Sequence, residues 1–147
     1  MRARNWNAKK TFVYGILFDS KAEADYYKLL LADPDVEKVE VQPVFEIIPT
    51  YPVTCYRCNG SGKRTSPKTG KPINCTLCSG KGEKTKAGAK YTADFKVYYK
   101  DGWTEIVDVK GGPASRDFSL RRKLLEKAIG QEVTVIEYKH GEWKKKR

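Results

Sequence analysis

The feature that most constrains the fold is a pair of short β segments, residues 91–99 and 103–110, joined by Lys100-Asp101-Gly102. An Asp-Gly pair between two stretches of alternating apolar residues predicts a β-hairpin. A three-residue loop with the glycine in the left-handed conformation places Tyr99 opposite Trp103. The register of every residue further along the two strands follows from this pairing.

The predicted register sets two acidic residues against each other. Asp94 is expected to lie opposite Asp108, with Lys110 two residues further along on the same face. Cross-strand partners have Cβ atoms about 5 Å apart, and like charges there are destabilising unless a cation compensates them. We therefore expect a divalent metal ion at the two carboxylates. The alternatives are an ordinary ion pair between Asp108 and Lys110 and a solvated Asp94.

Helix and strand patterns surround this hairpin. Ser20 followed by Glu23 fits a capping box, and apolar residues at helical spacing continue to Asp33-Pro34, so we expect a helix from residue 20 to about 31. The other expected elements are a short strand or hairpin at 11–18, a strand at 36–48 interrupted at Gln42-Pro43, a helix at 117–129 ended by Gly130, a strand at 133–136 and a basic tail at 143–147. With residues 51–90 set aside, this order predicts an αβββαβ core of the α/β class.

Residues 51–90 interrupt the pattern and contain all four cysteines. The pairs Cys55/Cys58 and Cys75/Cys78 belong to two copies of a CxxCxGxG motif, separated by sixteen residues. This spacing predicts a tetrahedral four-thiolate zinc site, in which the glycines turn the chain so that backbone amides point at the sulfurs. A redox pair or disulfides are the alternative. The repeat resembles the zinc knuckles of DnaJ-type chaperones, which implies only the local metal-binding fold.

Charge is concentrated in the same insert. The chain has 29 Lys and Arg against 18 Asp and Glu, a net charge of +11, which predicts a polyanionic partner, nucleic acid first and an acidic membrane surface second. From Cys55 to Lys90 there are nine basic residues and one acidic residue, so this stretch carries +8. We expect the insert to contact DNA phosphates, a solvated loop being the alternative. The expected nucleic-acid contacts are Lys63, Arg64, Lys68, Lys71, Arg121 and Lys123.

Location and compartment are constrained by what the chain lacks. No apolar run approaches the roughly 20 residues of a membrane span. The first six residues have no hydrophobic segment behind them that could act as a secretory signal. We therefore expect no membrane partner and a cytoplasmic location, the host cytoplasm if the gene belongs to a phage. Paired cysteines in such a chain favour metal ligands over disulfides.

The ordered motifs resemble the PD-(D/E)XK nuclease superfamily. The αβββαβ order places Glu23 on the first helix, Asp94 on the second core strand and Asp108-Val109-Lys110 on the third. Residues 7–11, 15–24, 42–45 and 108–111 further resemble an uncharacterised phage-protein family of that superfamily. Two features depart from these patterns: Ala93 stands where the superfamily usually has proline, and the cysteine insert interrupts the core.

The resemblance implies a restriction-endonuclease-like core, residues 1–50 and 91–147, with a central mixed sheet flanked by helices and an inserted zinc knuckle at 51–90. It further implies Mg²⁺- or Mn²⁺-dependent hydrolysis of phosphodiester bonds. Asp94, Asp108 and the Val109 carbonyl would hold one or two ions, because Mg²⁺ prefers oxygen ligands. Glu23 would complete this site, its alternative role being that of the capping partner of Ser20. Lys110 would orient or deprotonate the attacking water, and zinc would be structural.

The resemblance also favours branched DNA as the substrate. Among phage proteins of this size and fold it points to Holliday-junction resolvases, which act as homodimers so that two active sites cut paired strands. Two other classes remain open from the sequence: a non-catalytic zinc-dependent nucleic-acid-binding protein that uses the core as a scaffold, and an RNA-directed nuclease.

Overall fold

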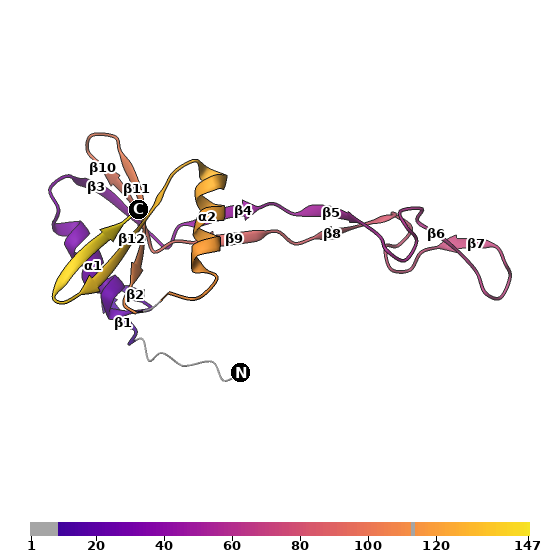
Figure 1. Cartoon of the computed structure of the whole chain (residues 1–147), viewed down its shortest axis with the longest axis horizontal. Coiled ribbons are helices and arrows are strands. Elements are labelled where there is room, and N and C mark those ends of the chain that lie inside the picture. Colours follow the sequence, from indigo (N-terminus) through magenta and orange to yellow (C-terminus); the bar gives the residue numbers. More distant parts are fainter. Residues whose placement is uncertain (1–8, 113) are drawn as a thin grey trace. The chain divides into compact units, whose positions relative to one another are not determined.

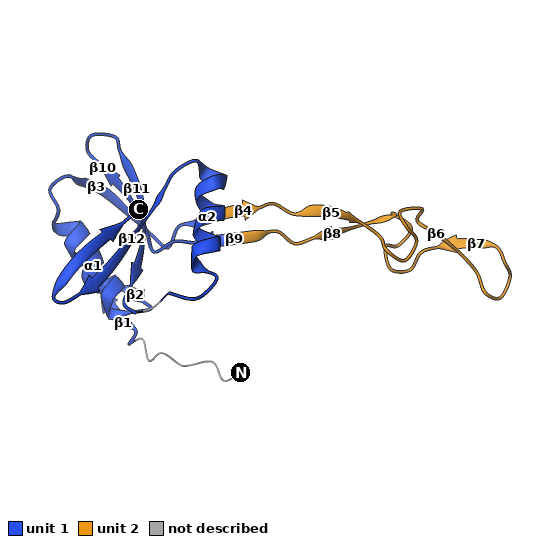
Figure 2. Cartoon of the chain, in the orientation of Figure 1, with its two compact units in different colours: residues 1–45, 91–147 blue, residues 46–90 orange. Residues whose placement is uncertain are grey.

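A computed structural model describes residues 9–112 and 114–147 and divides the chain into two compact units (Figures 1 and 2). Unit 1 comprises Met1–Phe45 and Tyr91–Arg147, and unit 2 comprises Glu46–Lys90. Residues 7 and 8, the start of the first phage-family motif, lie outside the described residues. Neither helix in the described ranges has the length and apolar character needed to cross a membrane.

Unit 1 is a mixed α/β structure. Its elements are β1 (Thr11–Val13), β2 (Ile16–Phe18), α1 (Lys21–Ala32), β3 (Val36–Val41), β10 (Phe95–Tyr99), β11 (Thr104–Lys110), α2 (Phe118–Ile129), β12 (Val133–Lys139) and β13 (Glu142–Lys146). Five strands form one sheet in the order β13-β12-β11-β10-β3. Only β11 and β12 are parallel within it, and α2 is the crossover between them. The predicted order of helix, strand, hairpin, helix and strand is confirmed.

The hairpin register is also confirmed. Phe95 pairs with Val107, and the amide of Tyr99 donates to the Trp103 carbonyl at 2.9 Å. Gly102 has a φ of 92°, the left-handed conformation that the loop requires. Asp94 precedes Phe95 and Asp108 follows Val107, but the strand pairing ends at Phe95, and the Asp94 amide donates to the Val107 carbonyl at 3.1 Å.

The core of unit 1 packs between α1 and one face of the sheet. Tyr27 stacks on Phe95 with ring centroids 5.9 Å apart, and Phe18 and Tyr26 approach the same fully buried ring at 6.0 and 6.2 Å. Helix α1 begins where expected, because the Ser20 hydroxyl accepts a hydrogen bond from the Glu23 amide at 3.2 Å. Residues that alternate with this core on β11, such as Asp108 and Lys110, point to the other face.

Two expectations about strands need correction. Residues 36–48 form not one strand but β3 and β4 (Val44–Ile48), which belong to different sheets, because Gln42 adopts a φ of 52° that ends the pairing of β3. Residues 143–147 are not a free basic tail. They lie largely in β13, where Trp143 pairs with Tyr138 and packs 5.2 Å from the Tyr26 ring.

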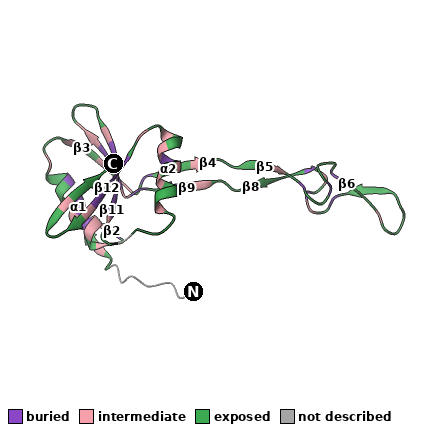
Figure 3. Ribbon diagram, viewed as in Figure 1, coloured by how far each residue is buried: buried purple, intermediate pink, exposed green. Residues whose placement is uncertain are grey.

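Unit 2 contains more regular structure than its composition suggests. Strands β5 (Tyr51–Thr54) and β8 (Glu83–Lys86) pair antiparallel, as do β6 (Lys63–Thr65) and β7 (Pro72–Asn74). Strand β4 pairs with β9 (Ala89–Thr92), where the chain returns toward unit 1. Figure 3 shows that the strands of unit 2 are mostly exposed, and its buried residues are the four cysteines and two glycines, Gly62 and Gly82. Unit 2 therefore has no apolar core of its own beyond the cysteine cluster.

Candidate functional site

The candidate site of unit 1 lies where β11 ends beside the start of α1. A Cβ added to Gly111 would lie 3.4 Å from the Cβ of Ala22, so the chain after β11 touches the first turn of the helix. Glu23 occupies that turn. The helix cap at Ser20 therefore brings an acidic residue from α1 to the same end of β11 as Asp108 and Lys110.

Asp94 is held by the backbone of the neighbouring strand. Its carboxylate accepts a hydrogen bond from the Val109 amide at 2.7 Å, and its own carbonyl accepts one from Gln42 at 2.9 Å. Burial and the negative charges of Glu23 and Asp108 raise the pKa of Asp94 to about 7. The bond from Val109 and the charge of Lys110 oppose that rise.

Asp108 is only 3 % exposed. Its Oδ2 atom accepts a hydrogen bond from the hydroxyl of Tyr91, a residue that no sequence motif singles out. Burial raises the pKa of Asp108, and the Tyr91 bond and the charges of Lys110 and Arg122 oppose the rise. Burial and the Asp108 charge also raise the pKa of Tyr91, so its hydroxyl keeps its proton and remains a donor.

Glu23 keeps the capping contact with Ser20 and also lies near Asp94. Burial raises its pKa, while a hydrogen bond with Ser20, the capping partner, acts in the opposite direction. Glu23 is nevertheless close enough to raise the pKa of Asp94 by its charge. The Lys110 ammonium lies 4.1 Å from the centroid of the Phe118 ring, and its charge opposes the rise in the pKa of all three carboxyl groups.

The structure thus brings the predicted Glu23, Asp94, Asp108 and Lys110 into one electrostatic cluster, with Val109 contributing its amide. The three carboxylates do not converge as tightly as the cysteines do. Within the described ranges, only the four cysteines form a group of three or more ligands whose atoms all lie within 4.8 Å of one another.

Helix α2 contributes more to this site than expected. Phe118, Arg121 and Arg122 share one helical face with the buried Leu125, at the i, i+3, i+4, i+7 spacing. Phe118 contacts Lys110, and the Arg121 guanidinium lies 5.5 Å from the Tyr91 ring centroid. Arg121, which we expect to contact nucleic acid, therefore packs beside the site and remains exposed. Lys123, the other expected contact on α2, is also exposed but does not belong to this helical face.

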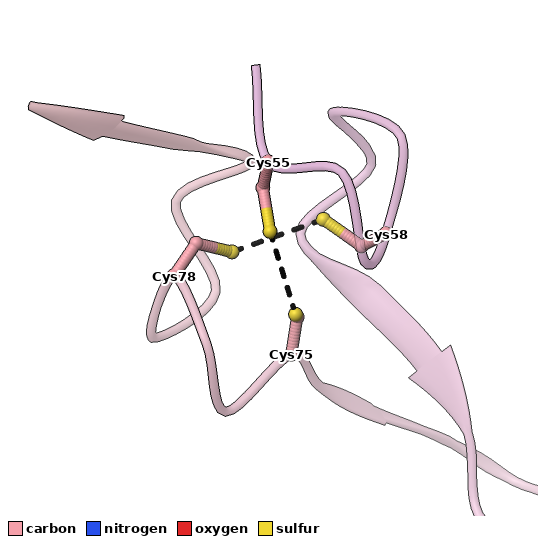
Figure 4. Close-up of side chains that lie close together, drawn as sticks. All are labelled: Cys55, Cys58, Cys75 and Cys78. Carbon is pink, nitrogen blue, oxygen red and sulfur yellow. Dashed lines mark hydrogen bonds between the residues drawn. The ribbon is translucent and has the colours of Figure 1, made fainter. Parts of the chain in front are cut away.

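Unit 2 holds the second candidate site, a metal centre. The sulfurs of Cys55 and Cys75 lie 3.9 Å apart, and those of Cys58 and Cys78 lie 3.8 Å apart (Figure 4). A tetrahedral Zn²⁺ with Zn–S bonds of about 2.3 Å requires sulfurs about 3.8 Å apart, whereas a disulfide requires about 2 Å. All four cysteines are free and buried. The cluster could hold a structural metal ion, and its geometry fits zinc.

The two knuckles of this centre interlock through their backbones. The amide of Cys55 donates to the Gly82 carbonyl and that of Cys75 to the Gly62 carbonyl, both at 2.9 Å. Gly62 and Gly82 also donate to the sulfurs of Cys58 and Cys78, both at 3.2 Å, as the repeated motif predicts. Burial acts against ionisation of Cys58, but the Gly62 bond and the neighbouring thiols lower the pKa of Cys58 to about 6. A thiolate is the form that binds metal.

The basic residues selected in unit 2 are exposed, but they are not equivalent. Lys63 donates to the Asn74 side chain at 2.6 Å, across the β6–β7 pair. Arg64, Lys68 and Lys71 are exposed on the same hairpin and its loop. These side chains are accessible to an anionic partner.

The interlocked glycines generate a prediction about metal retention. A Cβ on Gly62 would lie 2.4 Å from the Gly80 carbonyl oxygen, while one on Gly70 would meet nothing within 4 Å, although both have a positive φ (73° and 65°). Gly62→Ala is expected to weaken zinc binding at least about tenfold, equivalent to about 1.4 kcal/mol, and Gly70→Ala to leave it nearly unchanged. Competition with a colorimetric zinc chelator measures this. Equal affinities for the two variants, or less than about half an equivalent of zinc in the wild-type chain, would contradict the assigned centre.

The raised pKa of Asp94 generates a prediction about pH. Because the folded state binds this proton more tightly than the unfolded state, Asp94 contributes stability at low pH that is lost as the pH rises from about 4 to about 7. In buffer without Mg²⁺, the gain in free energy of unfolding from Asp94→Asn should be larger at pH 8 than at pH 4.5, by more than about 1 kcal/mol. Denaturant titrations at both pH values measure the difference. The exposed Asp35→Asn serves as the control, and a pH-independent difference for Asp94→Asn would contradict the assignment.

Comparison with known proteins gives a family without an assigned activity. No curated protein and no solved structure matches the chain. One family model, described as a protein of unknown function (DUF1064), matches residues 3–143. Because this match spans nearly the whole chain, the protein belongs to the DUF1064 family.

Proposed function

We propose that the protein is a Mg²⁺-dependent DNA endonuclease with a restriction-endonuclease-like core. The observation that carries this proposal is the grouping of Asp94, just before β10, with Asp108 and Lys110 of β11 and with Glu23 of α1. Burial raises the pKa of each of these carboxyl groups, and the negative charges of Glu23 and Asp108 raise that of Asp94 further. A divalent cation would relieve this repulsion, as expected for carboxylates arranged to bind one.

The order of elements supports the same proposal. Helix α1 precedes β3, the β10–β11 hairpin follows, and α2 connects β11 to the parallel strand β12. This is the order that the resemblance to PD-(D/E)XK nucleases implies. The acidic residues come from the positions of that motif: the first helix, the residue before β10 and the third residue from the end of β11.

Each residue of the cluster has a distinct task in this reaction. The carboxylates of Asp94 and Asp108, with Glu23 beside them, would hold the Mg²⁺ ion. Such an ion would supply Lewis-acid activation of a water molecule and of the scissile phosphate. Lys110, whose ammonium is held against Phe118, orients the water or neutralises charge on the phosphate. An open pocket of about 340 Å³ lies beside Lys110 and is also lined by Gly111 and by Lys139, which is paired with Glu137 in the same lining.

Nucleic acid is the polyanion that the charge distribution favours. Unit 2 exposes lysine and arginine side chains along a hairpin stabilised by the cysteine cluster, and α2 exposes Arg121 and Lys123. Phosphate contacts of this kind provide sequence-independent affinity. From the resemblance to Holliday-junction resolvases we extend the proposal to branched DNA and to a homodimer that cuts paired strands.

A cleavage assay tests the proposed activity. The zinc-loaded protein is incubated with matched four-way junction, flap, linear duplex, single-stranded DNA and RNA, with Mg²⁺ present or omitted. Omission is preferable to a chelator, which would also remove zinc. We expect Mg²⁺-dependent cleavage of junctions that Asp108→Asn lowers at least about 100-fold, about 2.7 kcal/mol in barrier height, while Asp35→Asn has no effect. Asp35 is exposed and lies outside the cluster.

The other outcomes separate the competing functions. Binding without cleavage of any substrate would favour a non-catalytic zinc-dependent nucleic-acid-binding protein and overturn the enzyme proposal. Cleavage of RNA alone would identify an RNA-directed nuclease. Equal cleavage of linear duplex and four-way junction would remove the resolvase assignment and keep the nuclease.

The charged hairpin of unit 2 generates a separate prediction about affinity. Replacing Lys63, Arg64, Lys68 and Lys71 by Gln should reduce the slope of log K against log salt concentration by about 3 to 4, since each phosphate contact to duplex DNA contributes about 0.9. Fluorescence anisotropy with a labelled junction, in Ca²⁺ to prevent cleavage, measures the slope. The matched control replaces four basic residues of unit 1, Lys28, Lys38, Lys96 and Lys100, by Gln. An unchanged slope in the unit 2 variant would remove this hairpin from the DNA interface.

A further inference from the structure

Tyr91 contacts the proposed site, and neither the sequence motifs nor the family match assigns it a role. It lies in β9, is only 4 % exposed, and donates its hydroxyl hydrogen to Oδ2 of Asp108. A phenol has a single hydrogen to donate, so this donor is committed to the carboxylate. Asp108 has no ion pair in the described part of the chain, which leaves Tyr91 as its side-chain hydrogen-bond partner there.

The position of Tyr91 is fixed from both sides. The amides of Ala93 and Asp94 donate to the carbonyls of Pro43 and Val107 at 3.1 Å each, so the segment from Tyr91 to Asp94 is bonded to backbone on either side. Arg121 of α2 places its guanidinium over the Tyr91 ring. One short segment therefore contributes the Asp94 carboxylate directly and reaches the Asp108 carboxylate through Tyr91.

We propose that Tyr91 is a positioning residue of the proposed nuclease site, which orients Asp108 so that Oδ1 is the oxygen that binds the divalent cation. The proposal rests on the proposed function. With Oδ2 committed to the phenol, rotation of the carboxylate costs a buried hydrogen bond. Partners of this kind set the orientation of a metal-binding carboxylate, and losing one typically lowers metal affinity about 10- to 100-fold. Arg121 supports the arrangement by restricting the ring.

A tyrosine–carboxylate pair within the five-stranded sheet shows what a purely structural bond looks like. Tyr99 donates to Oε1 of Glu105 at 3.3 Å, and Glu105 is 1 % exposed. Glu105 also accepts from Thr134 and pairs with Lys145 at 3.5 Å and Arg147 at 3.3 Å. Its charge is compensated within the protein, whereas that of Asp108 has no such pair. Tyr99 is therefore a matched control for Tyr91.

The test compares Tyr91→Phe with Tyr99→Phe in the full, zinc-loaded chain, using Mn²⁺ as the probe. Water-proton relaxation measures the Mn²⁺ dissociation constant, and denaturant unfolding measures stability. Tyr91→Phe is expected to weaken Mn²⁺ binding at least about 10-fold, with Tyr99→Phe within about twofold of the wild type whatever its loss of stability. In cleavage assays, Tyr91→Phe should raise the Mn²⁺ concentration for half-maximal rate more than it lowers the rate at saturating Mn²⁺.

Further variants make each outcome decisive. Arg121→Met, which leaves the phenol in place but frees the ring, should weaken Mn²⁺ binding by less than Tyr91→Phe, and it provides a second measurement should the latter fold poorly. Suppose that Tyr91→Phe and Arg121→Met both bind Mn²⁺ with wild-type affinity, while Asp108→Asn abolishes binding. This result would overturn the role of Tyr91 and leave the proposed nuclease intact. Absence of Mn²⁺ binding by the wild-type chain would overturn both.

Discussion

The antiparallel pairing of β10 and β11 is the constraint on which unit 1 depends. The three-residue loop ending at Gly102 sets Phe95 against Val107, and the period of two along each strand then assigns every side chain to a face. Phe95 joins the aromatic cluster beneath α1, while Asp108 and Lys110 face α2. A slip of one residue would exchange the two sets, placing charges in the apolar core.

The candidate site carries an electrostatic cost that the rest of the unit offsets. Three carboxyl groups whose pKa values all rise on folding oppose the folded state at neutral pH, because each must ionise in a partly desolvated position. Close packing of Phe18, Tyr27 and Phe95 on the other face of the sheet stabilises the arrangement. Sites that bind charged ligands commonly contain ionisable groups with shifted pKa values, held in place by well-packed neighbouring structure.

Local patterns predict much of the fold and part of the site. The hairpin register, the Ser20 cap and the cysteine motifs depend on residues close in sequence, and the structure confirms them. Strand β13 escaped prediction because a lysine-rich segment becomes a strand only when β12 offers an edge. Tyr91 was missed for the same reason, since its partner Asp108 is seventeen residues away on another strand. Contacts between residues far apart in the chain produce no hydrophobic periodicity or short motif from which they could be predicted.

The crossed hydrogen bonds of unit 2 have a consequence for how that unit forms. Each CxxCxGxG loop closes on the amide of the other, through Cys55 with Gly82 and Cys75 with Gly62, so neither loop is complete alone. Half of the insert alone would leave the amide of its cysteine without the carbonyl that the other half provides. The two copies are therefore expected to fold together, as a single cooperative element that could hold one metal ion.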